Sequence, residues 1–157
     1  MIKNKISKDN RGFFLKLFNT EKANYKSFNV KQSCLSYTKK KGTIRGMHYQ
    51  EYPNYEKKIV TCVKGKIFDV VLDVRKKSKT FLKYKTYILD AKKNNSIIVK
   101  KGFAHGYQTL QNNCWVFYNI DQKYKKNKQR VVLWNDIRIN IKWPLRPKNL
   151  SKKDRGF

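Results

Sequence analysis

The sequence predicts an all-β fold, an antiparallel sandwich or barrel, within a single domain that spans residues 1–157. Three observations carry this prediction. Short segments rich in Val, Ile, Tyr, Phe and Trp recur every 8–15 residues. The helical segments that a parallel α/β sheet requires between its strands are not evident. The length of 157 residues suits one domain and is enough to bury a sizeable core.

The expected strands can be placed in chain order from composition and from the turn residues between them. The segments that read as strands are 57–63, 66–74, 85–89, 96–99, 115–120 and 131–134. Within 66–74 the side chains alternate with a period of two, which is the period of a strand. A turn or two near 20–25 is the only helical signal, and the basic run 123–130 reads as a solvated loop.

The composition is strongly basic, with 38 Lys and Arg residues against 10 Asp and Glu and a formal net charge of +28. Such a charge attracts nucleic acid, anionic membranes and anionic small molecules. However, only 7 of these residues are arginines, the residue type that recognition of phosphates and bases enriches. We therefore interpret most of the charge as codon drift in an AT-rich genome, and expect only non-specific attraction to nucleic acid.

The cysteines and the hydrophobic pattern bear on the cellular compartment. Cys34, Cys62 and Cys114 are odd in number and show no CxxC spacing, so we expect reduced, mostly buried thiols. No stretch approaches 18 consecutive apolar residues, which argues against a transmembrane helix, and residues 1–14 lack the apolar run of a secretory signal. These features predict a cytoplasmic protein without a membrane partner.

Histidine is rare in this chain and therefore informative. His48 stands in RGMHYQ and His105 in GFAHGYQ, and both segments would be strands with glycines beside the histidine. Two histidines in a β-barrel suggest a metal site, but such a site usually has a third histidine or a carboxylate close in sequence, and only Glu51 follows within four residues. Two hydrogen-bonded core histidines are the simpler interpretation of these residues, and we expect no metal.

Four longer motifs follow one another along the chain. They are RGMHYQ at 45–50, KIVTCVKGKIFDVVLDVRKKSKTF at 58–81, GFAHGYQTL at 102–110 and VLWNDIRINIKWP at 132–144. In this order and spacing they closely resemble the dTDP-4-dehydrorhamnose 3,5-epimerases, and the resemblance runs from Arg11 to about Asp154. It implies a cupin-type jelly roll that forms a homodimer, needs no metal or other cofactor, and acts as an isomerase on a nucleotide-linked sugar.

The resemblance also implies catalytic roles for individual residues. A 4-keto group acidifies the protons at C3 and C5 of a sugar, so epimerisation needs a base on one ring face, an acid on the other and a group that stabilises the enolate. His48 matches the family's base, Asp154 the carboxylate that orients this base, and Tyr118 the acid. Lys58 matches the cation beside the ketone, and His105 matches a sugar-binding histidine.

Contacts with the nucleotide follow from the same resemblance. Arg11 and Arg45 match positions that grip the diphosphate, although arginines alone would read as surface charge. Tyr124 matches the ring that stacks on the base, and Gln32 and Lys153 match polar contacts with the nucleotide sugar. The expected partner is therefore a nucleotide-sugar substrate.

Four departures from the family pattern concern the nucleotide end. Ser7 stands where an aromatic residue is usual, Lys16 and Gln129 stand at glutamate positions, and Cys34 stands at an asparagine position.

The first hypothesis is an epimerase that converts dTDP-4-dehydro-6-deoxyglucose to dTDP-4-dehydrorhamnose and supplies precursors of lipopolysaccharide or capsule. One alternative is a paralogue that acts on a GDP- or UDP-linked 4-keto sugar or at one carbon only. The other is a basic polyanion-binding module that has lost catalysis.

Overall fold

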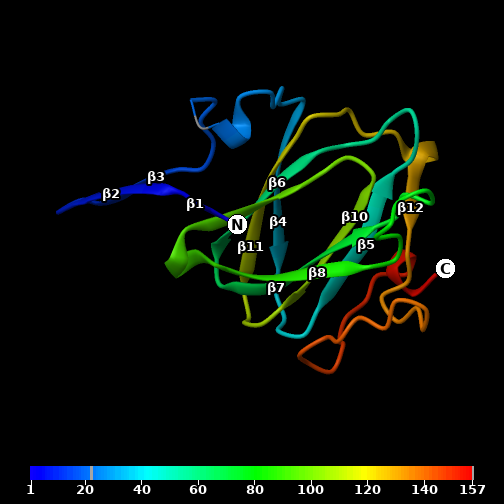
Figure 1. Ribbon diagram of the computed structural model, residues 1–157. Coiled ribbons are helices and arrows are strands. Elements are labelled where there is room, and N and C mark those ends of the chain that lie inside the picture. Colours follow the sequence, from blue (N-terminus) through cyan, green and yellow to red (C-terminus); the bar gives the residue numbers. More distant parts are fainter. Residues whose placement is uncertain (22, 157) are drawn as a thin grey trace.

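The computed structural model of the chain describes residues 1–21 and 23–156, which form mainly strands (Figure 1). In chain order the strands are β1 (Ile2–Lys3), β2 (Lys5–Asp9), β3 (Gly12–Lys16), β4 (Gln32–Thr38), β5 (Ile44–Gln50), β6 (Lys58–Lys64), β7 (Lys66–Asp73), β8 (Tyr84–Asp90), β9 (Asn95–Val99), β10 (Phe103–Thr109), β11 (Cys114–Ile120) and β12 (Gln129–Val131). Single-turn 3-10 helices lie between them and near the C-terminus: η1 (Ala23–Tyr25), η2 (Ala91–Lys93), η3 (Lys126–Lys128) and η4 (Lys153–Arg155). No helix in this described part of the chain is long and apolar enough to cross a membrane.

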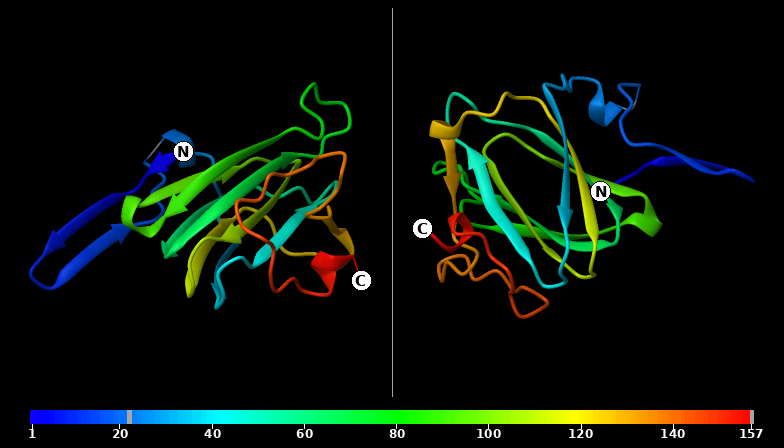
Figure 2. Two further views of the ribbon diagram at one scale, coloured as in Figure 1. Left: turned by 90° about the horizontal axis from the view of Figure 1, so that it is seen from below. Right: turned by 180° about the vertical axis from the view of Figure 1, so that it is seen from behind.

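Two five-stranded sheets form the body of the molecule (Figure 2). The first has the order β1-β9-β6-β11-β4 and the second the order β12-β5-β10-β7-β8, and neighbouring strands pair antiparallel in both. Strands that are distant in sequence are neighbours in each sheet, as in a jelly roll. The predicted all-β, cupin-type fold is confirmed.

Most of the predicted strands agree with the structure to within one or two residues, namely β6, β7, β8, β9 and β11. The prediction for 131–134 is wrong in position, because β12 ends at Val131. The chain turns after this strand, and the amide of Asp136 donates to the carbonyl of Leu133 at 3.2 Å. Turn formation here competes with further pairing of the edge strand.

Two further predictions need refinement. Of the helical turn expected over 20–25, residue 22 lies outside the described residues and Ala23–Tyr25 forms one 3-10 turn. The run 123–130 is mostly exposed as expected, but it is not simply a loop, because it contains η3 and the start of β12.

Strand β7 is covered on both faces, which explains its nearly continuous apolar sequence. Ile67 belongs to the core cluster between the sheets, which also includes Val60 of β6. Val70 and Leu72 lie on the other face and pack in a second cluster with residues of the segment 139–143. The period of two therefore separates two packed faces, and only the face of Ile67 looks into the space between the sheets.

The loop after β7 is fixed by one buried carboxylate. Asp73 is fully buried and accepts hydrogen bonds from Arg75 Nε at 2.9 Å, from Ser78 Oγ at 2.6 Å and from Thr80 Oγ1 at 2.6 Å. Hydrogen bonds from Arg75 are the main cause that lowers the pKa of Asp73, and those from Ser78 and Thr80 add to the effect.

We expect Asp73→Asn to lower the free energy of unfolding by about 2–4 kcal/mol at neutral pH, because the partners of a buried charge are left poorly satisfied. A carboxyl with a lowered folded-state pKa contributes stability above its ordinary pKa, and this contribution is lost as the pH falls. The difference between wild type and variant should therefore shrink below about pH 4. Urea unfolding at pH 7 and pH 3 measures it, and equal differences at both pH values would contradict the prediction.

A hairpin of β2 and β3 projects from the body near the N-terminus (Figures 1 and 2). Phe13 and Phe14 on this hairpin are each 68% exposed. Adjacent aromatic side chains on a projecting arm are typical of a surface that packs against a partner.

Candidate active site

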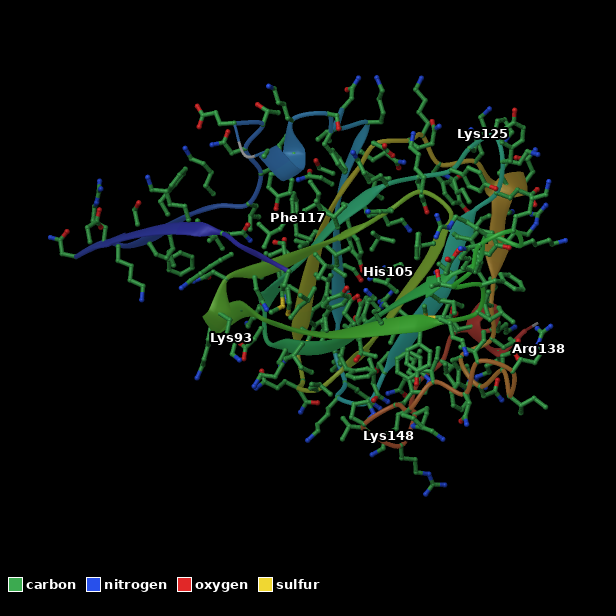
Figure 3. All side chains as sticks on the ribbon, in the orientation of Figure 1. Lys93, His105, Phe117, Lys125, Arg138 and Lys148 are labelled. Carbon is green, nitrogen blue, oxygen red and sulfur yellow. The ribbon has the colours of Figure 1, made fainter. Side chains whose placement is uncertain are left out.

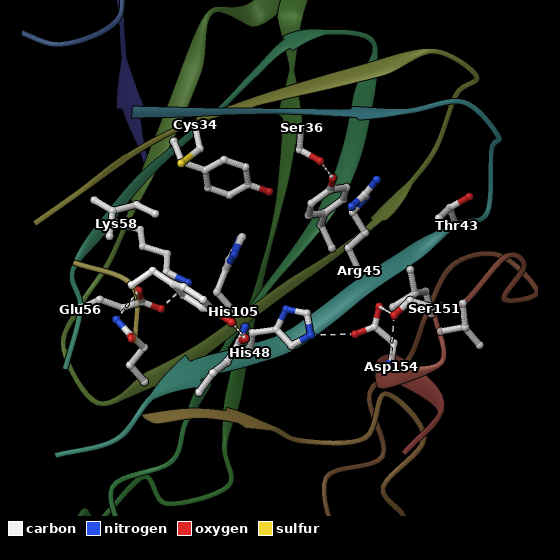
Figure 4. A pocket seen from close by; sticks show the side chains of 18 of the residues that line it. Cys34, Ser36, Thr43, Arg45, His48, Glu56, Lys58, His105, Ser151 and Asp154 are labelled. Carbon is white, nitrogen blue, oxygen red and sulfur yellow. Dashed lines mark hydrogen bonds and ion pairs between the residues drawn. The ribbon is translucent and has the colours of Figure 1, made fainter. Parts of the chain in front are cut away.

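A cavity of about 840 Å³ opens between the two sheets and is lined by side chains from both (Figure 4). The first sheet contributes residues of β4, β6 and β11, and the second contributes residues of β5 and β10. Further lining comes from Thr43 before β5, Glu56 before β6, Tyr124 in the loop before β12, Gln129 of β12 and the segment around η4. Most residues expected at the site from the sequence line this cavity: Gln32, Arg45, His48, Lys58, His105, Tyr118, Tyr124 and Asp154.

The two histidines stand opposite each other on neighbouring strands. His48 of β5 is the register partner of His105 of β10, so both side chains leave the same face of the sheet. A slip of one residue in this pairing would turn one of them away from the cavity. Strand register therefore brings together two residues that are far apart in sequence.

His48 is bound to a carboxylate from the C-terminal segment. Its Nε2 lies 2.7 Å from Oδ1 of Asp154, and Oδ2 of Asp154 accepts from Ser151 Oγ at 2.8 Å (Figure 4). Burial opposes ionisation of Asp154, but hydrogen bonds from His48 and Ser151 outweigh it, and the pKa of this carboxyl is lowered. An ionised Asp154 accepts the Nε2 proton, which leaves the Nδ1 lone pair of His48 able to take up a proton.

His105 forms a second, deeper pair with a carboxylate. Its Nε2 lies 2.8 Å from Oδ2 of Asp69 on β7, and the two side chains are 5% and 0% exposed. Asp69 is a residue of the site that the sequence prediction misses. It lies on the face of β7 that looks between the sheets, and an acidic residue on a buried strand face rarely lacks a polar partner. That position in the alternating pattern is the signal that could have found it.

Tyr118 of β11 faces the histidines from the opposite sheet. Its ring centre lies 6.1 Å from that of His105, with an interplanar angle of 77°. Burial raises the pKa of the Tyr118 phenol well above its ordinary value, and Tyr107 and Asp69 raise it further. The phenol therefore holds its proton at neutral pH and can donate it as a general acid.

Lys58 lies at the start of β6 and is paired with an acidic residue two positions earlier. Its Nζ lies 2.7 Å from Oε1 of Glu56, and the side chains are only 12% and 9% exposed. The other oxygen of Glu56 accepts from Gln50 Nε2 at 3.2 Å. Glu56 and Gln50 are further cavity residues to which the sequence prediction assigns no role; Gln50 ends the RGMHYQ motif, whereas no local pattern marks Glu56.

The polar residues expected at the nucleotide are held by neighbouring groups. Arg45 donates from Nε to Thr38 Oγ1 at 3.0 Å and so lies along the cavity wall. The Tyr124 hydroxyl donates to Gln129 Oε1 at 2.7 Å, and Lys153 Nζ donates to the same oxygen. Gln129, one of the departures from the family pattern, therefore connects two residues expected to contact the nucleotide.

Two expected site residues, Arg11 and Lys153, do not line the cavity; Lys153 contacts the cavity residue Gln129, whereas Arg11 lies away from the cavity of its own chain. It stands in the turn of the β2–β3 hairpin with its side chain 85% exposed, and it forms an ion pair of 2.7 Å with Asp9. Ser7 and Lys16, two of the departures, lie on the same hairpin. The differences from the family pattern therefore concern an arm as well as the cavity wall.

The cysteines and the possible metal ligands can be described for residues 1–21 and 23–156. All three thiols are free; Cys62 and Cys114 are buried, whereas Cys34 is exposed and lines the cavity. Burial is the main cause that raises the pKa of the Cys62 thiol to about 12. No group of three or more His, Cys, Asp or Glu side chains within these residues is placed to hold a metal ion.

The fold and the cavity together define a class of enzyme. Groups that can take up and donate protons stand on two facing sheets, as an isomerase requires when it removes a proton from one face of a carbon and returns one to the other. The family model described as dTDP-4-dehydrorhamnose 3,5-epimerase matches residues 1–157, and the chain belongs to this family. It is a sugar epimerase of the isomerase class.

Individual relatives agree with this assignment. The dTDP-4-dehydrorhamnose 3,5-epimerase of Shigella flexneri is 39% identical over 153 residues, which cover 96% of this chain and 84% of the relative. The crystal structure of the Bacillus anthracis enzyme with TDP and PPi bound has a TM-score of 0.92 and 37% identity, with 98% of this chain and 89% of that chain covered. A Legionella pneumophila dTDP-6-deoxy-D-glucose-3,5-epimerase, in complex with dTDP-4-keto-L-rhamnose, has a TM-score of 0.90 and 31% identity, with 98% and 83% covered.

Proposed function

We propose that this chain converts dTDP-4-dehydro-6-deoxyglucose to dTDP-4-dehydrorhamnose by inverting C3 and C5, with the cavity between the sheets as its active site. The observation that carries the proposal is the placement of His48 and Tyr118, which face one cavity from opposite sheets. The relatives described above are named for this substrate class, which favours dTDP over the GDP- and UDP-linked alternatives.

The chemistry can be assigned to residues of this chain. His48, held by Asp154, takes up the proton from the carbon beside the ketone. The electron pair of the broken C–H bond moves to the ketone oxygen and forms an enolate, which returns its electrons to the same carbon when Tyr118 donates a proton from the opposite face. The configuration of that carbon is thereby inverted, and no atom other than a proton is exchanged.

Two further groups support this reaction. The ammonium group of Lys58 offsets the negative charge on the enolate oxygen, and this effect is large because Lys58 is mostly shielded from water. His105 binds the sugar, and its bond to Asp69 fixes the orientation of its ring. The two histidines thus have different roles although both are paired with an aspartate.

The homodimer belongs to the same proposal, because it accounts for the position of Arg11. This residue lies on a projecting hairpin that also exposes Phe13 and Phe14. If the hairpin packs against a second copy of the chain, Arg11 can grip the diphosphate in the partner's cavity, while Arg45 does so from within. The free thiols support a reducing compartment such as the cytoplasm for this reaction.

Mixing two defective variants tests this arrangement. His48→Ala removes the base and Arg11→Ala weakens diphosphate binding, so each homodimer should be at least about tenfold less active than wild type in kcat/KM. Co-refolded mixtures should regain about a quarter of the wild-type activity, because half of the dimers are hybrids with one complete site. Activity equal to the sum of the separate variants would show instead that Arg11 does not act in the partner's cavity.

The proposed function is tested by offering the purified protein dTDP-4-dehydro-6-deoxyglucose and following the product by NMR. Inversion at both C3 and C5 is expected, and inversion at one carbon would favour the narrower alternative.

Titration with dTDP, GDP and UDP at low and high salt separates an epimerase from a polyanion binder. We expect dTDP to retain its affinity, whereas duplex DNA binds with a Kd of about 10⁻⁴–10⁻⁶ M at physiological salt and dissociates as salt rises. Tight DNA binding without nucleotide binding would overturn the proposal.

A further inference from the structure

Gln50 connects two parts of the cavity with different proposed roles, the loop around Tyr124 and the ion pair of Glu56 with Lys58. It is the last residue of β5, its side chain lines the cavity, and the residue is only 2% exposed. Its Nε2 donates to Lys123 O at 3.1 Å, and its Oε1 accepts from the amide of Lys125 at 2.7 Å. The side chain therefore holds the backbone on both sides of Tyr124, much as a neighbouring strand would.

The same amide nitrogen also reaches the other end of the cavity. Gln50 Nε2 donates to Oε2 of Glu56 at 3.2 Å, and Oε1 of Glu56 lies 2.7 Å from Nζ of Lys58 (Figure 4). Both N–H groups and the oxygen of this amide can thus be used at once, and so can both oxygens of the carboxylate. A continuous chain of polar contacts runs from the backbone of Lys123 and Lys125, on either side of Tyr124, through Gln50 and Glu56 to Lys58.

We propose that Gln50 and Glu56 are positioning residues, which hold the base-stacking Tyr124 and the enolate-stabilising Lys58 as one rigid unit. The inference rests on the proposed function, since it assigns neither residue a contact with the reacting atoms. Glu56 fixes the ammonium group, because a buried lysine with several rotatable bonds would otherwise sample many positions. Gln50 fixes the loop around Tyr124 and transmits its position to Glu56. Nucleotide binding and the chemical step therefore depend on the same two side chains.

Figure 3 shows the side chains on the ribbon. A buried glutamine that does not line the cavity offers a matched control. Gln108 is 0% exposed, its Nε2 donates to Leu145 O at 2.9 Å, and its Oε1 accepts from the amide of Leu145 at 3.0 Å. It is not among the residues that line the cavity. Gln108→Met and Gln50→Met therefore remove the same kind of buried amide bonds, but only the second change disturbs the proposed unit.

The test compares kcat, KM and the Kd for dTDP in these variants. Gln50→Met should lower kcat and weaken dTDP binding, each about tenfold, because buried hydrogen bonds to both ends of the unit are lost. Glu56→Gln removes the charge beside Lys58 but can keep the bond to Gln50, so kcat should fall about tenfold while the Kd for dTDP stays within about twofold. Gln108→Met should leave both constants within about twofold of wild type, even if its melting temperature falls.

The outcomes distinguish this inference from the proposed function. If wild type is active and Gln50→Met matches Gln108→Met in kcat and in dTDP affinity, the positioning role is overturned and the epimerase remains. If wild type epimerises no dTDP-4-keto sugar, the proposed function fails and the positioning role fails with it. Should Gln50→Met not fold, Gln50→Glu retains the shape and one acceptor but places a second carboxylate against Glu56, and wild-type kcat in that variant would equally overturn the role.

Discussion

Replacing His48 with alanine is expected to abolish the uptake of deuterium from D2O at C3 and C5 and to lower epimerisation by at least about 10³-fold, since a general base contributes about 10²–10⁴-fold. The reason is geometric: with its Nε2 bound to Asp154 at 2.7 Å, His48 lines the cavity with a nitrogen that can take up the proton. Proton NMR of the substrate in D2O measures the exchange directly, separately from the formation of product.

Asp154→Asn is the informative companion of this variant, because it keeps the imidazole and changes only its partner. An amide can donate to Nε2 and stabilise the opposite tautomer of His48, so a loss of at least about 10²-fold in kcat is expected with little change in KM. Exchange at the wild-type rate in His48→Ala would remove this residue from the base assignment. Loss of exchange in His48→Ala but not in Asp154→Asn would retain the base and reduce Asp154 to a structural partner.

The fold could be predicted from the sequence where strands have an apolar face, as in β6, β7 and β11, but not where the strand lacks an apolar pattern. In β4 the residues that line the cavity are Gln32, Cys34 and Ser36, so the strand shows no apolar alternation. The β2–β3 hairpin is exposed over most of its length, and no buried face imposes a pattern on it either. β7, packed on both faces, gave the clearest signal.

The residues of the site also fall into two groups. Some can be predicted from sequence patterns, whereas others depend on which strands pair in three dimensions. The resemblance predicts His48 and Tyr118, and the structure brings both to one cavity, while their roles remain predictions. Asp69 could have been noticed as an acid on a buried face, but its partner His105 depends on the pairing of β7 with β10. Glu56 could not have been found, because a buried ion pair with Lys58 has no sequence signature among so many charged residues.

The position of Arg11 sets a different limit on prediction from one sequence. Its motif predicts a diphosphate contact, whereas the structure places Arg11 on a projecting hairpin, away from the cavity of its own chain. A sequence motif specifies a residue and its neighbours, but not which copy of the chain receives the side chain. The homodimer proposed above would resolve this difference by placing the arm of one copy at the cavity of the other.

Replacing Tyr118 with phenylalanine should separate the two halves of the reaction. The variant keeps the ring against His105 and loses only the hydroxyl, so the cavity should keep its shape and dTDP its affinity. The proton can still leave to His48 and return from the same side, so deuterium exchange should fall less than tenfold. Inversion needs a proton from the opposite face, and product formation should fall by at least about 10²-fold.

Burial raises the pKa of the Tyr118 phenol, so the phenol carries its proton at neutral pH and can donate it to the enolate. Tyr87→Phe is a suitable control, since this half-buried tyrosine packs against the core cluster and does not line the cavity. It should exchange and epimerise as wild type does. An equal loss of deuterium exchange and product formation in Tyr118→Phe would contradict this prediction. Tyr118 would then act on the first proton transfer as well. The acid on the far face would have to be another group of the first sheet.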